Sequence, residues 1–146
     1  METTTATTFF CDGSIHPDLI ARELTEFAAG SGAHSVFIGR VRPDMNENRE
    51  VIAIEYTLYE MMAEEIMQNI SSEVKKKFDL LDIRILHSVG TVASGENSLL
   101  VIVSAAHRLH TFAACSEIVD RIKSEVPVWG KEIFSDHAHR WKKTGS

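Results

Sequence analysis

This chain of 146 residues lacks the excess of positive charge that marks many nucleic-acid and membrane-surface proteins. Its 15 Lys and Arg residues face 21 Asp and Glu residues, for a formal net charge of -6. Nucleic acids and anionic membranes both attract proteins through a broad positive field, so we expect neither as a partner. The negative balance still allows a local positive pocket for a small anion.

Cysteine is scarce, and apolar runs of membrane-spanning length are missing. The two cysteines, Cys11 and Cys115, lie far apart, and neither belongs to a C-x-x-C motif. Two such thiols indicate a reducing compartment rather than a disulfide framework. The first ten residues, METTTATTFF, lack the charged start and apolar centre of a signal peptide. We therefore expect a cytoplasmic protein.

Several motifs of common enzymes are also missing. The sequence has no GxGxxG and no phosphate-binding glycine loop that ends in Lys-Ser or Lys-Thr, so nucleotide binding of those kinds has no support. It has no GxSxG segment around a nucleophilic serine. Among seven histidines, the close pairs are His107 with His110 and His137 with His139, and neither pair has the further ligands that zinc needs. We therefore expect no metal site.

Helical and strand patterns alternate along the chain. Three helices are expected, over residues 16–30, 59–78 and 107–126. Four strands are expected from apolar or alternating segments, over Ala33–Val41, Val51–Leu58, Asp82–Val89 and Ser98–Ala105. We expect the first two strands to pair as a hairpin, the fourth to lie centrally, and the residues after Lys131 to wrap back as a strand or loop.

This order predicts an α+β domain in which helices pack on a mixed or largely antiparallel sheet. No repeat or low-complexity linker divides the chain, so we expect one domain over residues 1–146, with 1–8 and 142–146 flexible.

The apolar face of the second helix is predicted to comprise Met62, Ile66, Ile70 and Val74. A lone Trp129 is by default a core residue.

Basic residues gather at the ends of these predicted elements. His107 and Arg108 lie where the fourth strand meets the third helix, and free backbone N–H groups at a helix start favour an anion. Arg40 and Arg42 end the first strand and would reach the same place if the strand ends meet. Lys123 lies about four helical turns beyond Arg108, too far for one chain to join them. Basic residues that merely solvate element ends explain the pattern equally well.

Several ordered segments resemble the large, catalytic subunit of molybdopterin synthase. They are FIGRVR (37–42), EYTLYEMMA (55–63), HSVGTVASGE (87–96), SAAHRLHTF (104–112) and IKSEVPVWGKE (122–132), with Trp141 downstream. The segments extend over most of the chain from Ala33 onward. Each is weak alone, but the combination is specific.

The resemblance implies an α/β hammerhead fold with a small added β-subdomain. It also implies an enzyme of molybdenum cofactor biosynthesis that converts cyclic pyranopterin monophosphate to molybdopterin. Sulfur would come from the C-terminal thiocarboxylate of a small ubiquitin-like subunit, one at each end of a homodimer of large subunits, as a heterotetramer. No cofactor is implied, because the sulfur arrives already activated as a thioacid.

The resemblance carries functional residues over to this chain as well. Lys123 and Lys131 are the implied catalytic residues, and Lys123 would stabilise an oxyanion or transfer protons near the thiocarboxylate carbonyl. The implied substrate-binding residues are Arg40, Val41, Arg42, His107, Arg108, Lys123, Gly130, Lys131 and Glu132, with Phe37 and Trp129 as pocket support. Because the family's pocket is built partly across the dimer, Arg108 and Lys123 need not meet within one chain.

Gly130 departs from the family pattern, in which a catalytic lysine usually follows the tryptophan directly. Lys131 is the next residue, but neighbours in an extended segment point to opposite faces, so a compensating role depends on the freedom of the glycine. Two interpretations stay open: an active sulfurtransferase in which Lys131 compensates, or a weakened or non-catalytic homologue that still binds its partners. An unrelated α+β ligand-binding domain is a third.

Overall fold

The computed structural model describes residues 8–26, 30–46, 48–136 and 138–143. Most of the ends that we expect to be flexible, residues 1–7 and 144–146, lie outside the described residues. Three α-helices and one 3-10 turn are present in the described ranges: α1 (Pro17–Thr25), α2 (Glu60–Lys77), η1 (Arg108–His110) and α3 (Thr111–Glu125). The strands are β1 (Phe10–Asp12), β2 (Ala33–Arg40), β3 (Met45–Asn46), β4 (Arg49–Leu58), β5 (Asp82–Ala93), β6 (Asn97–Ala105), β7 (Val128–Phe134) and β8 (His139–Lys143).

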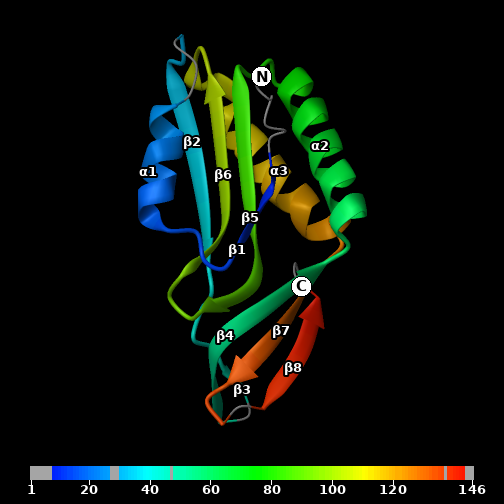
Figure 1. Cartoon of the computed structure of the whole chain (residues 1–146). Coiled ribbons are helices and arrows are strands. Elements are labelled where there is room, and N and C mark those ends of the chain that lie inside the picture. The colour runs from blue at the N-terminus through cyan, green and yellow to red at the C-terminus, as the bar shows by residue number, and fades with distance from the viewer. Residues whose placement is uncertain (1–7, 27–29, 47, 137, 144–146) are drawn as a thin grey trace, which may run out of the picture.

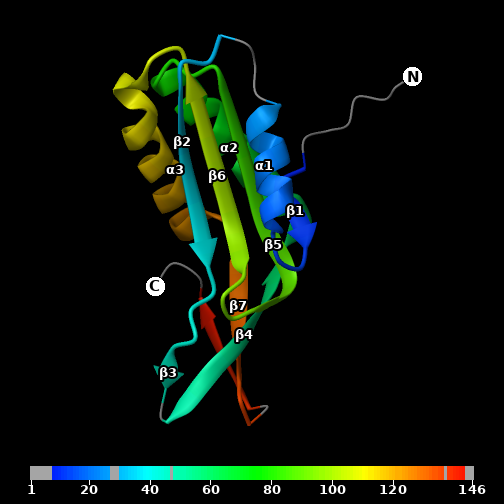
Figure 2. The same ribbon diagram turned by 90° about the vertical axis from the view of Figure 1, so that its left-hand side faces the viewer.

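The strands form one mixed sheet in the order β2-β6-β5-β4-β7-β8, and every neighbouring pair in this path is antiparallel. β1 pairs with β5 in parallel, and β3 pairs with β4. The upper sheet of β2, β6 and β5 is covered by α2 and α3 on one face and by α1 on the other (Figures 1 and 2). β4 runs down from it into a β-subdomain with β3, β7 and β8 (Figure 1). The predicted α+β fold with a small added β-subdomain is confirmed.

Two apolar clusters hold the helices on the sheet. The larger one joins α2 and α3 to the sheet and includes Met67, Ile70, Ile118 and Val101, all without exposed surface. The smaller one joins α1 to the opposite face through residues that include Ile20 and Leu100. β6 is buried along almost its whole length, which confirms its predicted central place. No described helix is long and apolar enough to cross a membrane.

The predicted hairpin of the first two long strands is wrong. β2 pairs with β6, whereas β4 pairs with β5 and β7. A long connection does not fix which strands pair, and β6, apolar on both faces, takes a neighbour on each side. Part of that connection forms the short strand β3, which pairs with β4.

The end of β5 and the buried face of α2 also differ from the sequence prediction. β5 continues past Val89 to Ala93, because Gly90 (φ 87°) adopts a left-handed conformation that keeps the strand paired with β4. The buried face of α2 comprises Ala63, Met67, Ile70 and Val74, whereas Met62 is 55% exposed. Spacings of four, three and four residues keep Ala63, Met67, Ile70 and Val74 on one face of the helix, and Met62 lies outside that face.

Candidate active site

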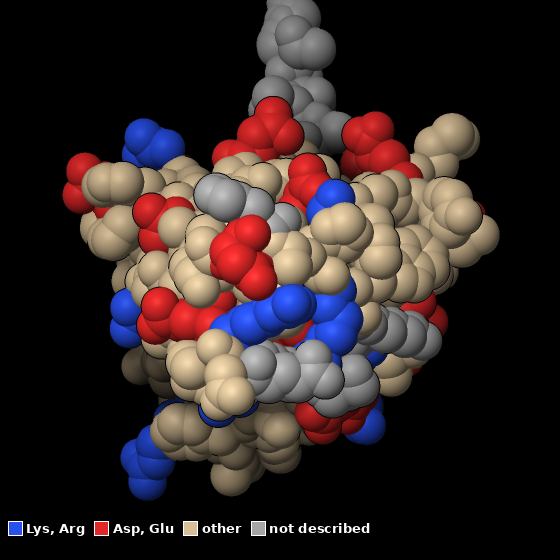
Figure 3. All heavy atoms as spheres, turned by 90° about the horizontal axis from the view of Figure 1, so that it is seen from below, with Lys and Arg blue, Asp and Glu red and all other residues tan. Residues whose placement is uncertain are grey.

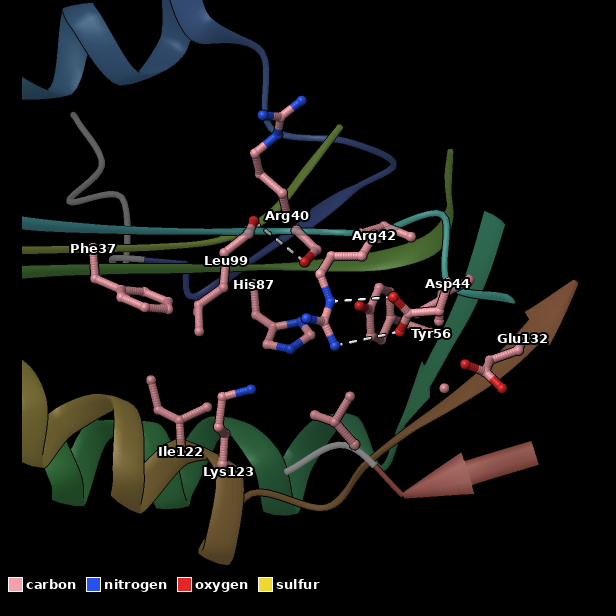
Figure 4. Close-up of a pocket in the computed structure, with 16 residues that line it drawn as sticks. Phe37, Arg40, Arg42, Asp44, Tyr56, His87, Leu99, Ile122, Lys123 and Glu132 are labelled. Carbon is pink, nitrogen blue, oxygen red and sulfur yellow. Dashed lines mark hydrogen bonds and ion pairs between the residues drawn. The ribbon is translucent and has the colours of Figure 1, made fainter. Parts of the chain in front are cut away.

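A cavity of about 250 Å³ lies where the C-terminal part of α3 faces the sheet, at the junction with the β-subdomain (Figure 4). Its walls come from β2 and the segment after it, from β4, β5, β6 and β7, and from α3. The lining residues are Phe37, Gly39, Arg40, Val41, Arg42, Asp44, Ile54, Tyr56, His87, Ser98, Leu99, Ile122, Lys123, Val128, Gly130 and Glu132. Segments far apart in the sequence therefore meet at this one place.

Lys123 reaches the cavity from α3. The preceding Ile122 is 3% exposed and belongs to the larger core cluster, so packing fixes this part of the helix on the sheet. The lysine itself is an exposed residue with a flexible stem, and its amine points toward the His87 ring (Figure 4). No hydrogen bond or ion pair joins Lys123 to another described residue. The cavity therefore has a cation with unused hydrogen-bond donors at its rim.

Arg42 contributes a second cation from the opposite wall. Its guanidinium pairs with Asp44, with Nε 3.3 Å from Oδ1 and Nη2 3.4 Å from Oδ2. Val41 is buried, donates to Glu96 O (3.0 Å) and accepts from Gly95 N (2.7 Å), which anchors this segment. Both side chains of the Arg42–Asp44 pair are more than 40% exposed, so the pair is weak and a stronger anionic ligand can replace Asp44.

Arg40 lines the cavity, but its guanidinium is used elsewhere. Its Nε and Nη2 donate to the carbonyl of Gly95 at 3.1 Å and 2.6 Å. The side chain points away from Lys123 and Arg42 (Figure 4). Arg40 therefore holds the turn between β5 and β6 in place, whereas Arg42 offers its charge to the cavity.

β7 separates its side chains between two faces. Val128, Gly130 and Glu132 are buried and line the cavity, whereas Trp129 and Lys131 point to the outer face. The Lys131 amine lies 3.0 Å from Glu55 Oε1 and 5.2 Å from the centroid of the Trp141 ring. A catalytic role for Lys131 stays a prediction, and it requires the amine to leave both contacts and cross the strand.

Trp129 and Glu132 occupy these two faces. Trp129 is only half-buried and packs edge-on against Tyr59, with ring centroids 5.2 Å apart, so it is neither a core residue nor part of the cavity wall. Glu132 is 2% exposed, and its Oε1 accepts from Nη2 (2.9 Å) and Nε (3.2 Å) of Arg140. A buried carboxylate needs such a partner.

His107 and Arg108 lie at the other end of α3 from Lys123. They are exposed and line a separate hollow of about 410 Å³ with Gly32, Ala106 and Leu109. The predicted separation of about four helical turns is confirmed, and the single chain does not bring these residues to the cavity. Their contribution across a dimer stays a prediction.

The sequence analysis did not predict the polar floor of the cavity, which His87 and Tyr56 form. His87 on β5 is 6% exposed, its Nδ1 lies 2.7 Å from Ser88 O, and its ring stands edge-on to Tyr56 with centroids 5.2 Å apart. Burial and, to a smaller extent, the charge of Lys123 lower the pKa of His87 to about 4, although the Ser88 hydrogen bond opposes this. Burial raises the pKa of Tyr56, against a hydrogen bond with Ser98. The one sequence feature that could have indicated this floor is a histidine within the apolar segment 82–89.

Other kinds of site have little support. Within the described residues, no group of three or more His, Cys, Asp or Glu side chains could hold a metal ion. The view from below shows a band of basic side chains bordered by acidic ones rather than a broad positive field (Figure 3). The cations of the cavity are therefore a local feature of an acidic protein.

The chain is similar in sequence and in fold to several known proteins. Residues 12–125 match the MoaE protein family. A molybdopterin synthase catalytic subunit from Pyrococcus abyssi is 40% identical over 114 residues, which are 78% of this chain and 76% of that protein. The Drosophila willistoni protein of the same name is 40% identical over 116 residues, but the match spans only 31% of its length. The crystal structure of molybdopterin synthase from Staphylococcus aureus has a TM-score of 0.82 at 28% identity, over 95% of this chain and 98% of that one. The chain belongs to the MoaE family, the family of molybdopterin synthase catalytic subunits.

Proposed function

We propose that this chain, as a cytoplasmic enzyme, transfers sulfur to cyclic pyranopterin monophosphate and so forms the dithiolene of molybdopterin. The sulfur donor is the C-terminal thiocarboxylate of a small ubiquitin-like subunit. Two copies of the chain form a homodimer, and one small subunit at each end completes a heterotetramer. The relatives are named catalytic subunits, which designates one part of a larger assembly.

The observation that carries this proposal is the pair of cations, Lys123 and Arg42, on opposite walls of one cavity. Arg42 exchanges Asp44 for the phosphate of the substrate, because a guanidinium forms charge-assisted, bidentate hydrogen bonds with phosphate. Lys123 stabilises the oxyanion that forms when a nucleophile attacks the thiocarboxylate carbonyl. His107 and Arg108 of the second copy add positive charge to the same cavity.

One observation favours a second candidate, a homologue with little catalytic activity. Gly130 places no side chain on the cavity face of β7, and the amine of Lys131 is paired on the outer face. The family's second lysine is then absent from the cavity, and Lys123 acts without it.

Reconstitution tests the two candidates. The purified chain is mixed with thiocarboxylated small subunit and cyclic pyranopterin monophosphate, and the dithiolene product is assayed. Our proposal expects product from the wild-type chain. Product from Gly130→Lys but none from wild type would establish the weakened homologue, and failure of both chains to bind the small subunit would exclude both.

A further inference from the structure

His87 is a buried polar residue at the cavity floor that none of the roles above uses. It lies on β5 opposite Leu99 of β6, and its backbone N–H donates to Phe9 O at 2.8 Å. Its ring packs edge-on against Tyr56. Strands on both sides and an aromatic neighbour therefore fix the ring, in contrast to the mobile stem of Lys123.

The Ser88 carbonyl determines which nitrogen of His87 holds the proton. A carbonyl oxygen only accepts, so Nδ1, 2.7 Å away, is the nitrogen that donates. In the neutral ring Nε2 then has no proton and offers a lone pair. The lowered pKa of His87 keeps the ring neutral over the physiological range.

The Lys123 amine is a candidate donor for this lone pair. The Lys123 amine points toward the ring (Figure 4), and its charge contributes to the low pKa of His87. The other charged or titratable groups that line the cavity are Arg40 at the end of β2, Arg42 and Asp44 after it, Tyr56 on β4 and Glu132 on β7. Arg40 donates to Gly95 O, Arg42 is paired with Asp44, and Glu132 is paired with Arg140. Among these cavity cations, Lys123 is therefore the one with donors to spare.

We propose that His87 is a positioning residue for Lys123, with Nε2 as the acceptor that orients the lysine ammonium over the cavity. The proton stays on the lysine, because an imidazole of such low basicity accepts a hydrogen bond and does not remove a proton from an amine. The orientation aims the charge at the site of the developing oxyanion. This role rests on the proposed sulfur transfer.

Three substitutions of His87 separate the role of Nε2 as a hydrogen-bond acceptor from the packing of the ring against Tyr56. His87→Gln supplies an oxygen close to the position of Nε2, whereas His87→Asn retains only a donor for the Ser88 carbonyl. His87→Phe keeps a ring against Tyr56 but has no acceptor. His16→Asn is the matched control, because His16 lies at the start of α1, away from the cavity, and asparagine is a good helix N-cap.

Single-turnover kinetics of product formation are the first readout, with circular dichroism to establish that each variant folds. We expect His87→Phe and His87→Asn to lower the rate about 10- to 100-fold, the size of one hydrogen bond to a charged group, with substrate affinity little changed. His87→Gln should recover most of this loss. Equal rates for wild type and His87→Phe, or equal rates for His87→Asn and His87→Gln, would overturn the proposal.

Nitrogen-15 NMR of the histidine rings is the second readout and needs no activity. We expect a protonated Nδ1 and an unprotonated Nε2 at pH 7, and a change in the Nε2 signal when Lys123 is replaced by Met. A ring protonated on Nε2 would overturn the proposal even if the enzyme is active. An inactive wild-type chain with the expected NMR signals would instead contradict the proposed sulfur transfer.

Discussion

The two faces of β7 differ in how deeply they bury charged side chains. On the cavity face, Glu132 is buried and depends on Arg140 for compensation, and Gly130 adds no side chain. On the outer face, Lys131, whose side chain is 25% exposed, pairs with a Glu55 side chain that is 43% exposed, so water reaches this pair. Removing a charge partner on the cavity face should therefore lower the free energy of unfolding more than removing one on the outer face.

Breaking the buried pair is expected to have the largest effect on stability. Arg140→Met leaves the Glu132 carboxylate buried without its guanidinium and should lower the free energy of unfolding by about 3 kcal/mol. Glu55→Gln breaks the exposed pair on the outer face and should cost at most about 1 kcal/mol. Urea unfolding at pH 7 measures both, and similar losses in the two variants would contradict the contrast between the faces.

His87 should make stability depend on pH. Its pKa is about 4 in the folded chain and near the ordinary value of 6.5 when unfolded, so the unfolded state binds more protons between these values. Stability should therefore fall as pH drops from 6.5 towards 4, by about 3 kcal/mol in total. Urea unfolding at pH 7 and pH 5 tests this, with His87→Phe as the variant in which this contribution vanishes. An unchanged pH dependence in His87→Phe would contradict it.

Lys131→Ala should have the smallest effect. Because the amine starts on the outer face, we expect turnover to fall only about 2- to 5-fold, yet more than in Lys76→Ala, which removes an exposed lysine of α2. Reconstituted turnover of the two variants measures this. Equal, negligible losses would exclude compensation by Lys131, and a loss as large as that of a cavity lysine would mean that it crosses the strand.

Local patterns in the sequence were sufficient for much of the fold. Pro17 and Pro127 mark helix boundaries by fixed backbone chemistry, and period-two alternation placed Gly130 and Lys131 on opposite faces of an extended segment. Strand pairing was not predictable in the same way, because β2 and β6 meet through contacts between residues more than 50 positions apart. The sequence alone gives no measure of which distant strand competes best for an edge.

The residues of the candidate site also fall into those that were predicted and those that were not. Lys123, Arg42 and Glu132 were predicted, through the resemblance, and they do line one cavity. His87 and Tyr56 were missed because each sits in a strand pattern that reads as ordinary core, and only the three-dimensional arrangement directs them to the cavity. His107 and Arg108 line a separate hollow in the single chain, and their contribution to the cavity across a dimer stays a prediction.

We propose above that Lys123 stabilises the oxyanion during sulfur transfer in this cavity. Its most direct test compares single-turnover formation of the dithiolene by wild type and by Lys123→Ala, with thiocarboxylated small subunit in excess. We expect product from wild type and a rate about 100- to 1,000-fold lower in the variant, the loss expected for one oxyanion-stabilising group. Product formation by Lys123→Ala at the wild-type rate would contradict it.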